Sequence, residues 1–323
     1  MRDHKPRVSI GLPVFNGEDY LEEALDSILA QTYSDFEILI SDNASTDRTE
    51  EICRAYTARD KRIRYFRNET NLGAAKNFNR VFELSSGEYF KWASYDDVLG
   101  PEFLSRCITV LDQDSSIALC HAKTGRINEH SALVGVYEEY QYLRLGSRKP
   151  HERFFDLIRL NHSCNIVFGV TRASALRMTS LIGPYPASDR VLLAQLGLIG
   201  RLHEIPDILF YRRDHPQTTW EVWGEKPEVV VWFDPTKAGR MVFPYWRLCF
   251  EYFMSINRVP LGWSDRLLCY VQWARLFKQR WRQNLPMWRW LVMDLERAAK
   301  QIRLCSRLSR KSDATSKRLK RVS

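Results

Sequence analysis

The stretch VSIGLPVFNGEDYLEEALDSILAQTYSDFEILISDNASTD, residues 8–47, decides the fold class. The run Arg7–Pro13, which overlaps the start of this stretch, is rich in β-forming residues. A second apolar run covers Phe36–Ser41. Between them, apolar residues of Glu18–Gln31 recur at helical spacing, which predicts an amphipathic helix. Strand, helix and strand in this order predict an α/β fold with a mostly parallel sheet flanked by helices.

The same alternation continues to about residue 112. We expect four further elements before a helix that opens near Pro101: a helix through Tyr56, then Arg62–Phe66, Gly73–Leu84 and Glu88–Ala93. Ligands of such sheets bind beyond the carboxyl ends of the strands. The loops 13–17, 42–47 and 94–100 should therefore converge on one site.

Beyond residue 112 the pattern weakens. Residues 113–150 show no clear period, and we expect an insertion or acceptor loop there. Four elements are expected after it: a helix over 151–160, a strand over 165–170, a helix over 188–198, and a closing strand and loop over 209–220.

Composition excludes several classes of protein. The chain has 323 residues, of which 45% are hydrophobic, enough for a sizeable core and against disorder. No apolar stretch approaches the roughly 18 residues that span a bilayer, and the first residues do not resemble a secretory signal. The seven cysteines form no CxxC pair, which argues against a zinc module or a disulfide framework. We therefore expect a cytoplasmic protein.

Charge divides the chain into two parts. Residues 240–323 contain 19 Lys and Arg against 5 Asp and Glu, a balance of +14, whereas residues 1–239 have a balance of −5, from 29 against 34. Six of the ten tryptophans also lie after residue 239. We expect a basic, aromatic helical extension over 240–300 and a basic, disordered tail over 301–323. This composition is typical of an interfacial helix on an anionic membrane, although its apolar stripes also fit ordinary core packing.

Three segments in a fixed order carry a family resemblance. They are residues 8–47, NETNLGAAKN at 68–77, and GEYFKWASYDDVLGPEFL at 87–104. Together they resemble the donor half of a family 2 glycosyltransferase with the GT-A fold, closely over about 7–112 and loosely over 151–215. The resemblance implies a GT-A domain over 1–239, with a nucleotide-sugar donor half over 1–112 and an acceptor half over 113–239.

The resemblance also implies a reaction. The protein would be an inverting enzyme that transfers a sugar from a nucleotide sugar to a hydroxyl of a glycan or lipid-linked acceptor, with Mg²⁺ or Mn²⁺ as cofactor. Surface polysaccharide biosynthesis, at the inner face of the membrane, would be its setting. Two alternatives stay open: an inactive glycosyltransferase-like scaffold, and a nucleic-acid-binding protein that uses the basic segment. No nucleic-acid-binding module is recognisable in the sequence, so we expect no nucleic-acid partner.

Donor-binding residues follow from the matching motifs. Asp42 matches the aspartate that contacts the nucleobase, although an aspartate in a loop is also a common turn residue. Pro13, Val14 and Asn16 belong to the turn PVFN, whose backbone lines the nucleotide in the family. Lys76 lies near the start of a predicted helix, where its charge and the helix dipole would favour phosphate; a solvated helix lysine is the alternative.

The segment Ser94-Tyr95-Asp96-Asp97 stands at the position of the family's Asp-x-Asp motif. Ser94 replaces the first aspartate, and Asp96 corresponds to the second, which is the metal ligand. A divalent ion takes one or two carboxylates and completes its shell with phosphate oxygens and water. We expect Ser94 and Asp97 to contact the donor. The plainer alternative is that the two aspartates cap the next helix.

Two further assignments come from the acceptor half. Asp189, in GPYPASDR at 183–190, matches the catalytic base, with Ser188 in place of a preceding acid; a simple N-cap is the alternative. In LFYRRDHPQTTW at 209–220, Arg212 or Arg213 and His215 are candidate contacts of the diphosphate or metal, and His215 is equally compatible with a plain loop residue.

Overall fold

The computed structural model describes residues 5–160, 162–218, 229–238, 240, 242–282, 292, 294–296 and 299. A nine-stranded sheet forms its centre, in the order β3-β2-β1-β4-β8-β6-β9-β5, with β7 paired to β6. The strands are β1 (Val8–Val14), β2 (Phe36–Asp42), β3 (Ile63–Arg67), β4 (Tyr89–Trp92), β5 (Val98–Leu99), β6 (Ile117–Ile127), β7 (Leu133–Val136), β8 (Val170–Arg172) and β9 (Arg201–Arg213).

Six of these strands, β1, β2, β3, β4, β6 and β9, run in one direction, and β5, β7 and β8 oppose them. The predicted mostly parallel sheet is therefore confirmed. The strands β1 and β2 are buried along their whole length, as expected for a sheet covered on both faces. The helices of the first half are α1 (Leu21–Leu29), α2 (Thr49–Arg59), α3 (Ala74–Glu83) and α4 (Phe103–Gln113).

The prediction of an irregular insertion over 113–150 is wrong. This segment contains β6, which lies between β8 and β9 in the sheet. The strand β7 follows and pairs with β6 in the antiparallel direction, and a 3-10 helix η1 (Glu139–Tyr142) comes after it. Nine of the eleven residues of β6 are buried, so its sequence lacks the alternation of polar and apolar residues that marks a strand with one wet face.

Two other predicted strands need correction. The run Asn165–Val170 is mostly a 3-10 helix, η2 (Asn165–Phe168), and only Val170 belongs to β8. The closing strand begins at Arg201 rather than Leu209, because β9 pairs with the whole length of β6. Residues 219–220 of the predicted closing loop lie outside the described residues.

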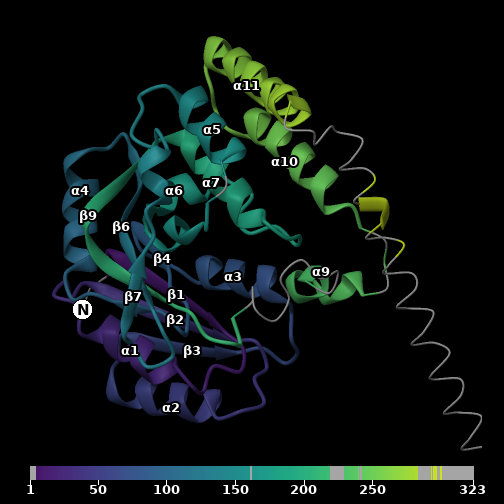
Figure 1. Cartoon of the computed structure of the whole chain (residues 1–323). Coiled ribbons are helices and arrows are strands. Elements are labelled where there is room, and N and C mark those ends of the chain that lie inside the picture. Colours follow the sequence, from purple (N-terminus) through teal and green to yellow (C-terminus); the bar gives the residue numbers. More distant parts are fainter. Residues whose placement is uncertain are drawn as a thin grey trace, which may run out of the picture.

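The remaining helices follow β7 in the chain. They are α5 (Pro150–Arg159), α6 (Ala173–Leu176), α7 (Ser188–Ile199), α9 (Val229–Phe233), the 3-10 helix η3 (Pro235–Lys237), α10 (Pro244–Arg258) and α11 (Trp263–Arg282). The last two lie on the side of α5 and α7, far from α1 and α2 (Figure 1). Tyr252, Ile256, Cys269 and Leu276 are buried there, so α10 and α11 pack on the acceptor half of the predicted domain. The predicted tail over 301–323 lies outside the described residues.

Two expectations from composition concern the cysteines and bilayer-spanning helices. The six cysteines in the described part of the chain are buried and form no disulfide with one another. Among the described helices, none combines the length and apolar character that a bilayer crossing requires.

Close packing between β1 and its neighbours leaves no room for a side chain at Gly11. A Cβ atom added there would lie 2.6 Å from Val81 Cγ2 and 2.7 Å from Phe90 Cζ. We expect Gly11→Ala to lower the free energy of unfolding by about 1–3 kcal/mol, the usual cost of overpacking a core. Urea unfolding followed by circular dichroism measures it. Gly146→Ala is the matched control, because nothing lies within 4 Å of its added Cβ; equal stability of the two variants would contradict the packing.

Candidate functional site

The carboxyl ends of the six co-directional strands meet at one edge of the sheet. Val14, Asp42 and Arg67 end β1, β2 and β3, and the first two lie in register across the sheet, as do Asp42 and Arg67. The turn after β4 carries Asp96, and β9 ends at Arg213. The predicted convergence of the loops after β1, β2 and β4 follows from this topology.

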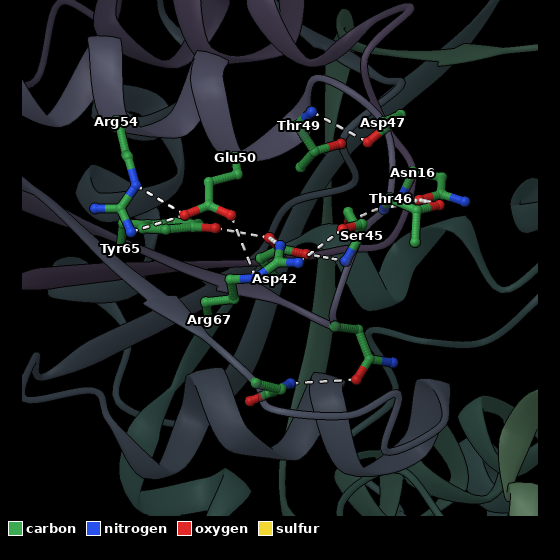
Figure 2. Close-up of polar contacts among 12 residues, drawn as sticks. Asn16, Asp42, Ser45, Thr46, Asp47, Thr49, Glu50, Arg54, Tyr65 and Arg67 are labelled. Carbon is green, nitrogen blue, oxygen red and sulfur yellow. Dashed lines mark hydrogen bonds and ion pairs between the residues drawn. The ribbon is translucent and has the colours of Figure 1, made fainter.

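Asp42 forms the centre of one polar cluster (Figure 2). Its side chain is fully buried and accepts hydrogen bonds from Ser45 N at 2.8 Å, Tyr65 Oη at 2.6 Å and Arg67 Nη1 at 2.6 Å. Arg67 also pairs with Glu50. In this structure the carboxylate therefore shapes the loop 42–47, and its burial keeps it from solvent.

The predicted nucleotide turn packs against that loop. Pro13 and Val14 are buried in β1, whereas Asn16 is exposed and has a φ of 50°, in the left-handed region. Asn16 Oδ1 accepts from Thr46 N at 2.8 Å, and Asn16 N donates to Ser45 Oγ at 2.9 Å. These reciprocal bonds hold the turns after β1 and β2 together (Figure 2).

A second cluster joins the turn after β4 to the end of β9. Asp96 Oδ2 lies 3.0 Å from His215 Nε2, and Ser94 Oγ donates to Asp96 Oδ1. The His215 ring is buried, lies 4.8 Å from the Tyr20 ring, and has no partner for Nδ1 among the described residues. Asp96 and His215 were predicted separately, and the fold brings them into contact.

Arg213 anchors this cluster from within. Its guanidinium is 1% exposed and donates to Asp96 O at 2.8 Å and to Glu23 Oε2 at 2.6 Å, while its backbone N–H donates to Asp97 Oδ1 at 3.0 Å. Burial, and secondarily the charge of Asp96, raise the pKa of Asp97 above its ordinary value. Arg213 and Asp97 are thus engaged inside the protein.

Arg212 points to a different set of partners. Its Nη1 donates to Asn165 Oδ1 at 2.9 Å. Burial lowers the pKa of Arg212, but nearby Tyr137 and the carboxylates of Asp97, Asp214 and Asp96 together raise it above its ordinary value. Asn165 follows Cys164, whose thiol is a hydrogen-bond partner of Asp189. Arg212 therefore connects the Asp96 cluster with the segment that contacts Asp189.

Asp189 occupies the first turn of α7, as predicted. Its Oδ1 accepts from the backbone N–H of Arg190 at 2.9 Å, and Arg190 is tied by its guanidinium to the carbonyls of Leu160 and His162. Desolvation raises the pKa of Asp189, and the contacts with Arg190 and Cys164 only partly oppose this. Ser188 next to it is fully buried, with no partner for Oγ in the described part of the chain.

Lys76 is exposed on the first turn of α3. Gly73, just before that helix, has a φ of 83°, and its Cα faces Phe233 and Pro235 closely enough that no Cβ would fit. The end of α9 therefore lies against the amino end of α3, as Figure 1 also shows. Among the described residues, Lys76 forms no hydrogen bond or ion pair with the clusters around Asp42 or Asp96.

Sequence reasoning missed several residues that hold these clusters. Tyr65 and Arg67 bind Asp42, Glu23 binds Arg213, and Asn165 binds Arg212. For Arg67 a signal existed, because Asp42 and Arg67 stand at the ends of adjacent predicted strands. The pairs Glu23–Arg213 and Asn165–Arg212 are separated by 190 and 47 residues in the sequence and have no local signature.

Comparisons with known proteins agree with this architecture. The family model "Glycosyl transferase family 2" matches residues 9–177, about half of the chain. An uncharacterized glycosyltransferase of Rickettsia typhi is 38% identical over 168 residues, which cover 51% of this chain and 50% of the relative. One from Haemophilus influenzae is 26% identical and covers 68% of this chain and 69% of the relative. The chain thus spans only about half the length of the Rickettsia typhi protein.

Solved structures share the fold. Staphylococcus aureus TarS residues 1–349, in complex with UDP, has a TM-score of 0.53 at 19% identity and covers 86% of this chain and 92% of that one. A mannosyltransferase from Pyrobaculum calidifontis, in complex with GDP-Man and Mn²⁺, has a TM-score of 0.54 at 16% identity, with coverages of 98% and 81%. The expected GT-A fold is confirmed, and from the family match the chain belongs to glycosyl transferase family 2.

Proposed function

We propose that the protein is an inverting glycosyltransferase that moves a sugar from a nucleoside-diphosphate sugar to a hydroxyl of a glycan or lipid-linked acceptor. The observation that carries the proposal is the contact between Asp96 and His215 at the carboxyl edge of the sheet. Support also comes from the solved neighbours, which hold UDP, UDP-GlcNAc or GDP-Man. Surface polysaccharide biosynthesis is the setting that we propose.

The Asp96–His215 pair fits a divalent cation. Asp96 Oδ2 and His215 Nε2, 3.0 Å apart, are an oxygen and a nitrogen donor that could together hold such an ion. No group of three potential metal ligands exists among the described residues. The remaining positions would thus belong to water and the donor phosphates, as is usual for Mg²⁺. When bound, the cation would neutralise charge on the departing diphosphate.

The chain's own residues would then position the donor. Asn16 and the loop shaped by Asp42 present backbone and amide groups where a nucleoside binds in GT-A proteins, and Lys76 adds a positive charge near the amino end of α3. Arg212, near Asp96 and Asp97, is the better candidate for a diphosphate contact, because Arg213 is buried and committed to Glu23.

Asp189 is the proposed general base. An ionised carboxylate within hydrogen-bond reach would accept the proton of the acceptor hydroxyl as that oxygen attacks the anomeric carbon. Attack from the face opposite the diphosphate inverts the configuration. The raised pKa of Asp189 makes the ionised carboxylate a stronger base than an exposed aspartate.

The first prediction concerns the metal. Asp96→Ala should lower turnover by about 100-fold or more, the usual loss when stabilisation of developing charge is removed. Release of the donor's nucleotide measures it: UDP, GDP or dTDP from the corresponding diphosphate sugars, and CMP from a CMP-sugar. Excess chelator should inhibit the wild type and leave the residual rate of the variant unchanged. Wild-type rates in chelator would contradict the metal assignment, and no release from any donor would favour an inactive scaffold.

The second prediction concerns the base. Asp189→Asn should lower kcat by roughly 10²- to 10⁴-fold while leaving donor affinity intact. Because the folded pKa of Asp189 is raised, the wild-type rate should increase with pH along a limb above the ordinary aspartate value, and the variant should lack that limb. Asp207→Asn, which removes a surface carboxylate paired with Arg106, is the control. Loss of donor binding would show a structural role instead.

We also propose that residues 240–323 bind an anionic membrane surface. The charge balance of +14 supports this. So does the outer face of α11, where Trp263 is 80% exposed and Leu267, Leu268 and Val271 are each at least 40% exposed, with Arg275 beside them. The opposite face, with Cys269 and Leu276, is buried. This is the arrangement of an interfacial helix.

The third prediction follows from that face. Replacing both Trp263 and Leu267 by Ser should weaken binding to vesicles that contain phosphatidylglycerol, and removing residues 307–323, with seven Lys and Arg, should weaken it further, at about 1 kcal/mol for each engaged charge. Vesicle sedimentation measures both effects, and salt should reduce binding. Val134→Ser, an exposed apolar residue of β7, is the control. Equal binding to neutral and anionic vesicles would contradict the proposal.

A further inference from the structure

A cavity of about 760 Å³ lies at the end of the sheet away from the candidate site. The strands β6 and β9 begin beside it, at Ile117 and Arg201, and run toward the edge that carries Asp96. Its walls come from the turn before β6, the start of α5, the end of α7 and the turn between α10 and α11. None of the residues proposed to bind the donor lines this cavity.

Among the charged residues of the lining, basic side chains outnumber acidic ones. Four arginines face two aspartates, namely Arg148, Arg153, Arg172 and Arg201 against Asp114 and Asp265. Two of the arginines are fixed by the protein. Arg172 donates to the carbonyls of Ile117, Leu111 and Asp114, and Arg201 pairs with the Asp114 carboxylate. The cavity therefore retains excess positive charge.

Arg153 is the unusual member of the set. Its side chain is 3% exposed, and it donates only to the backbone carbonyls of Gly197 and Ser147. Among the described residues, its Nη2 has no acceptor and its guanidinium no ion-pair partner. Burial, and secondarily the charge of Arg201, lower the pKa of Arg153 to about 10, so the group stays charged at neutral pH. Asp265 on the same lining favours the charged form of Arg153, although the two side chains form no ion pair. The buried charge is therefore only partly compensated, and an anion in the cavity would add to that compensation.

Arg148 provides a second available cation. It is exposed at the start of the segment that leads into α5, and in the described part of the chain it has no hydrogen-bond or ion-pair partner. Ser115 and Ser116 contribute hydroxyls to the same lining. Guanidinium groups bind phosphate oxygens through paired N–H donors, and hydroxyls complete such sites.

We propose that this cavity binds a phosphate group through Arg153 and Arg148. The phosphate is either free in solution or part of a lipid headgroup. The α10–α11 turn contributes Leu261 and Gly262 to the lining, and the exposed Trp263 follows directly. A headgroup could therefore enter from a surface on which α11 rests. Both sources present the same chemistry to the two arginines.

The experiment measures phosphate binding apart from activity. Inorganic phosphate and pyrophosphate are titrated calorimetrically into the full chain in phosphate-free buffer with EDTA, which removes metal from the donor site. Vesicles with phosphatidic acid, against phosphatidylcholine alone, form the lipid arm. We expect binding in at least one arm, weakened about tenfold or more by Arg153→Met, since a charge-assisted hydrogen bond to a buried group is lost.

Controls separate this site from the donor site. Arg148→Ala should also weaken binding, and because this side chain is exposed it tests the site even if Arg153→Met fails to fold. Arg177→Ala, an exposed arginine outside the cavity, and Asp96→Ala should bind phosphate as the wild type does. The proposal would be overturned if the protein bound in neither arm. It would also be overturned if both Arg148→Ala and Arg153→Met left binding unchanged, whatever the outcome at Asp96.

Discussion

The buried guanidinium of Arg213 is the constraint on which the candidate site depends. It joins the end of β9 to α1 through Glu23, to the turn after β4 through the Asp96 carbonyl, and to the loop after β6 through Asn128 and Ser131. A buried charge of this kind is tolerated only when its donors are satisfied. With these segments held together, His215, two residues further on, meets the carboxylate of Asp96.

The first third of the fold could be predicted from the sequence because its information is local. Apolar periodicity and turns mark the elements from β1 to α4 except β5, a two-residue strand within the predicted loop 94–100. The strand β6 could not be predicted in this way, because it is buried on both faces and its partners β8 and β9 lie far along the chain. The segment 165–168 has strand-like residues but forms a 3-10 helix, with Cys164 before it in the left-handed conformation. Tertiary context outweighs β-propensity there.

In the candidate site, too, some residues have local sequence signals and others do not. Asp42, Asp96, Asp189 and His215 lie in motifs and were identifiable as sequence. The residues that hold them, such as Tyr65 and Glu23, become visible only when the strands are aligned in the sheet. The motif predicts a role for Asp42 toward the ligand, and the structure adds a role inside the protein, because Asp42 accepts hydrogen bonds from Ser45, Tyr65 and Arg67. Arg213 is a similar case, since it was a candidate ligand contact and lies buried among protein partners.

The central claim is that Asp96 and His215 hold a divalent cation that binds the diphosphate of a nucleotide sugar. Calorimetric titration of UDP and of GDP into the full chain, each with and without Mn²⁺, tests it most directly. We expect at least one of these nucleotides to bind, and its affinity to rise with Mn²⁺ in the wild type but not in His215→Ala. Binding that is absent for both nucleotides, or equally tight with and without Mn²⁺, would contradict the claim.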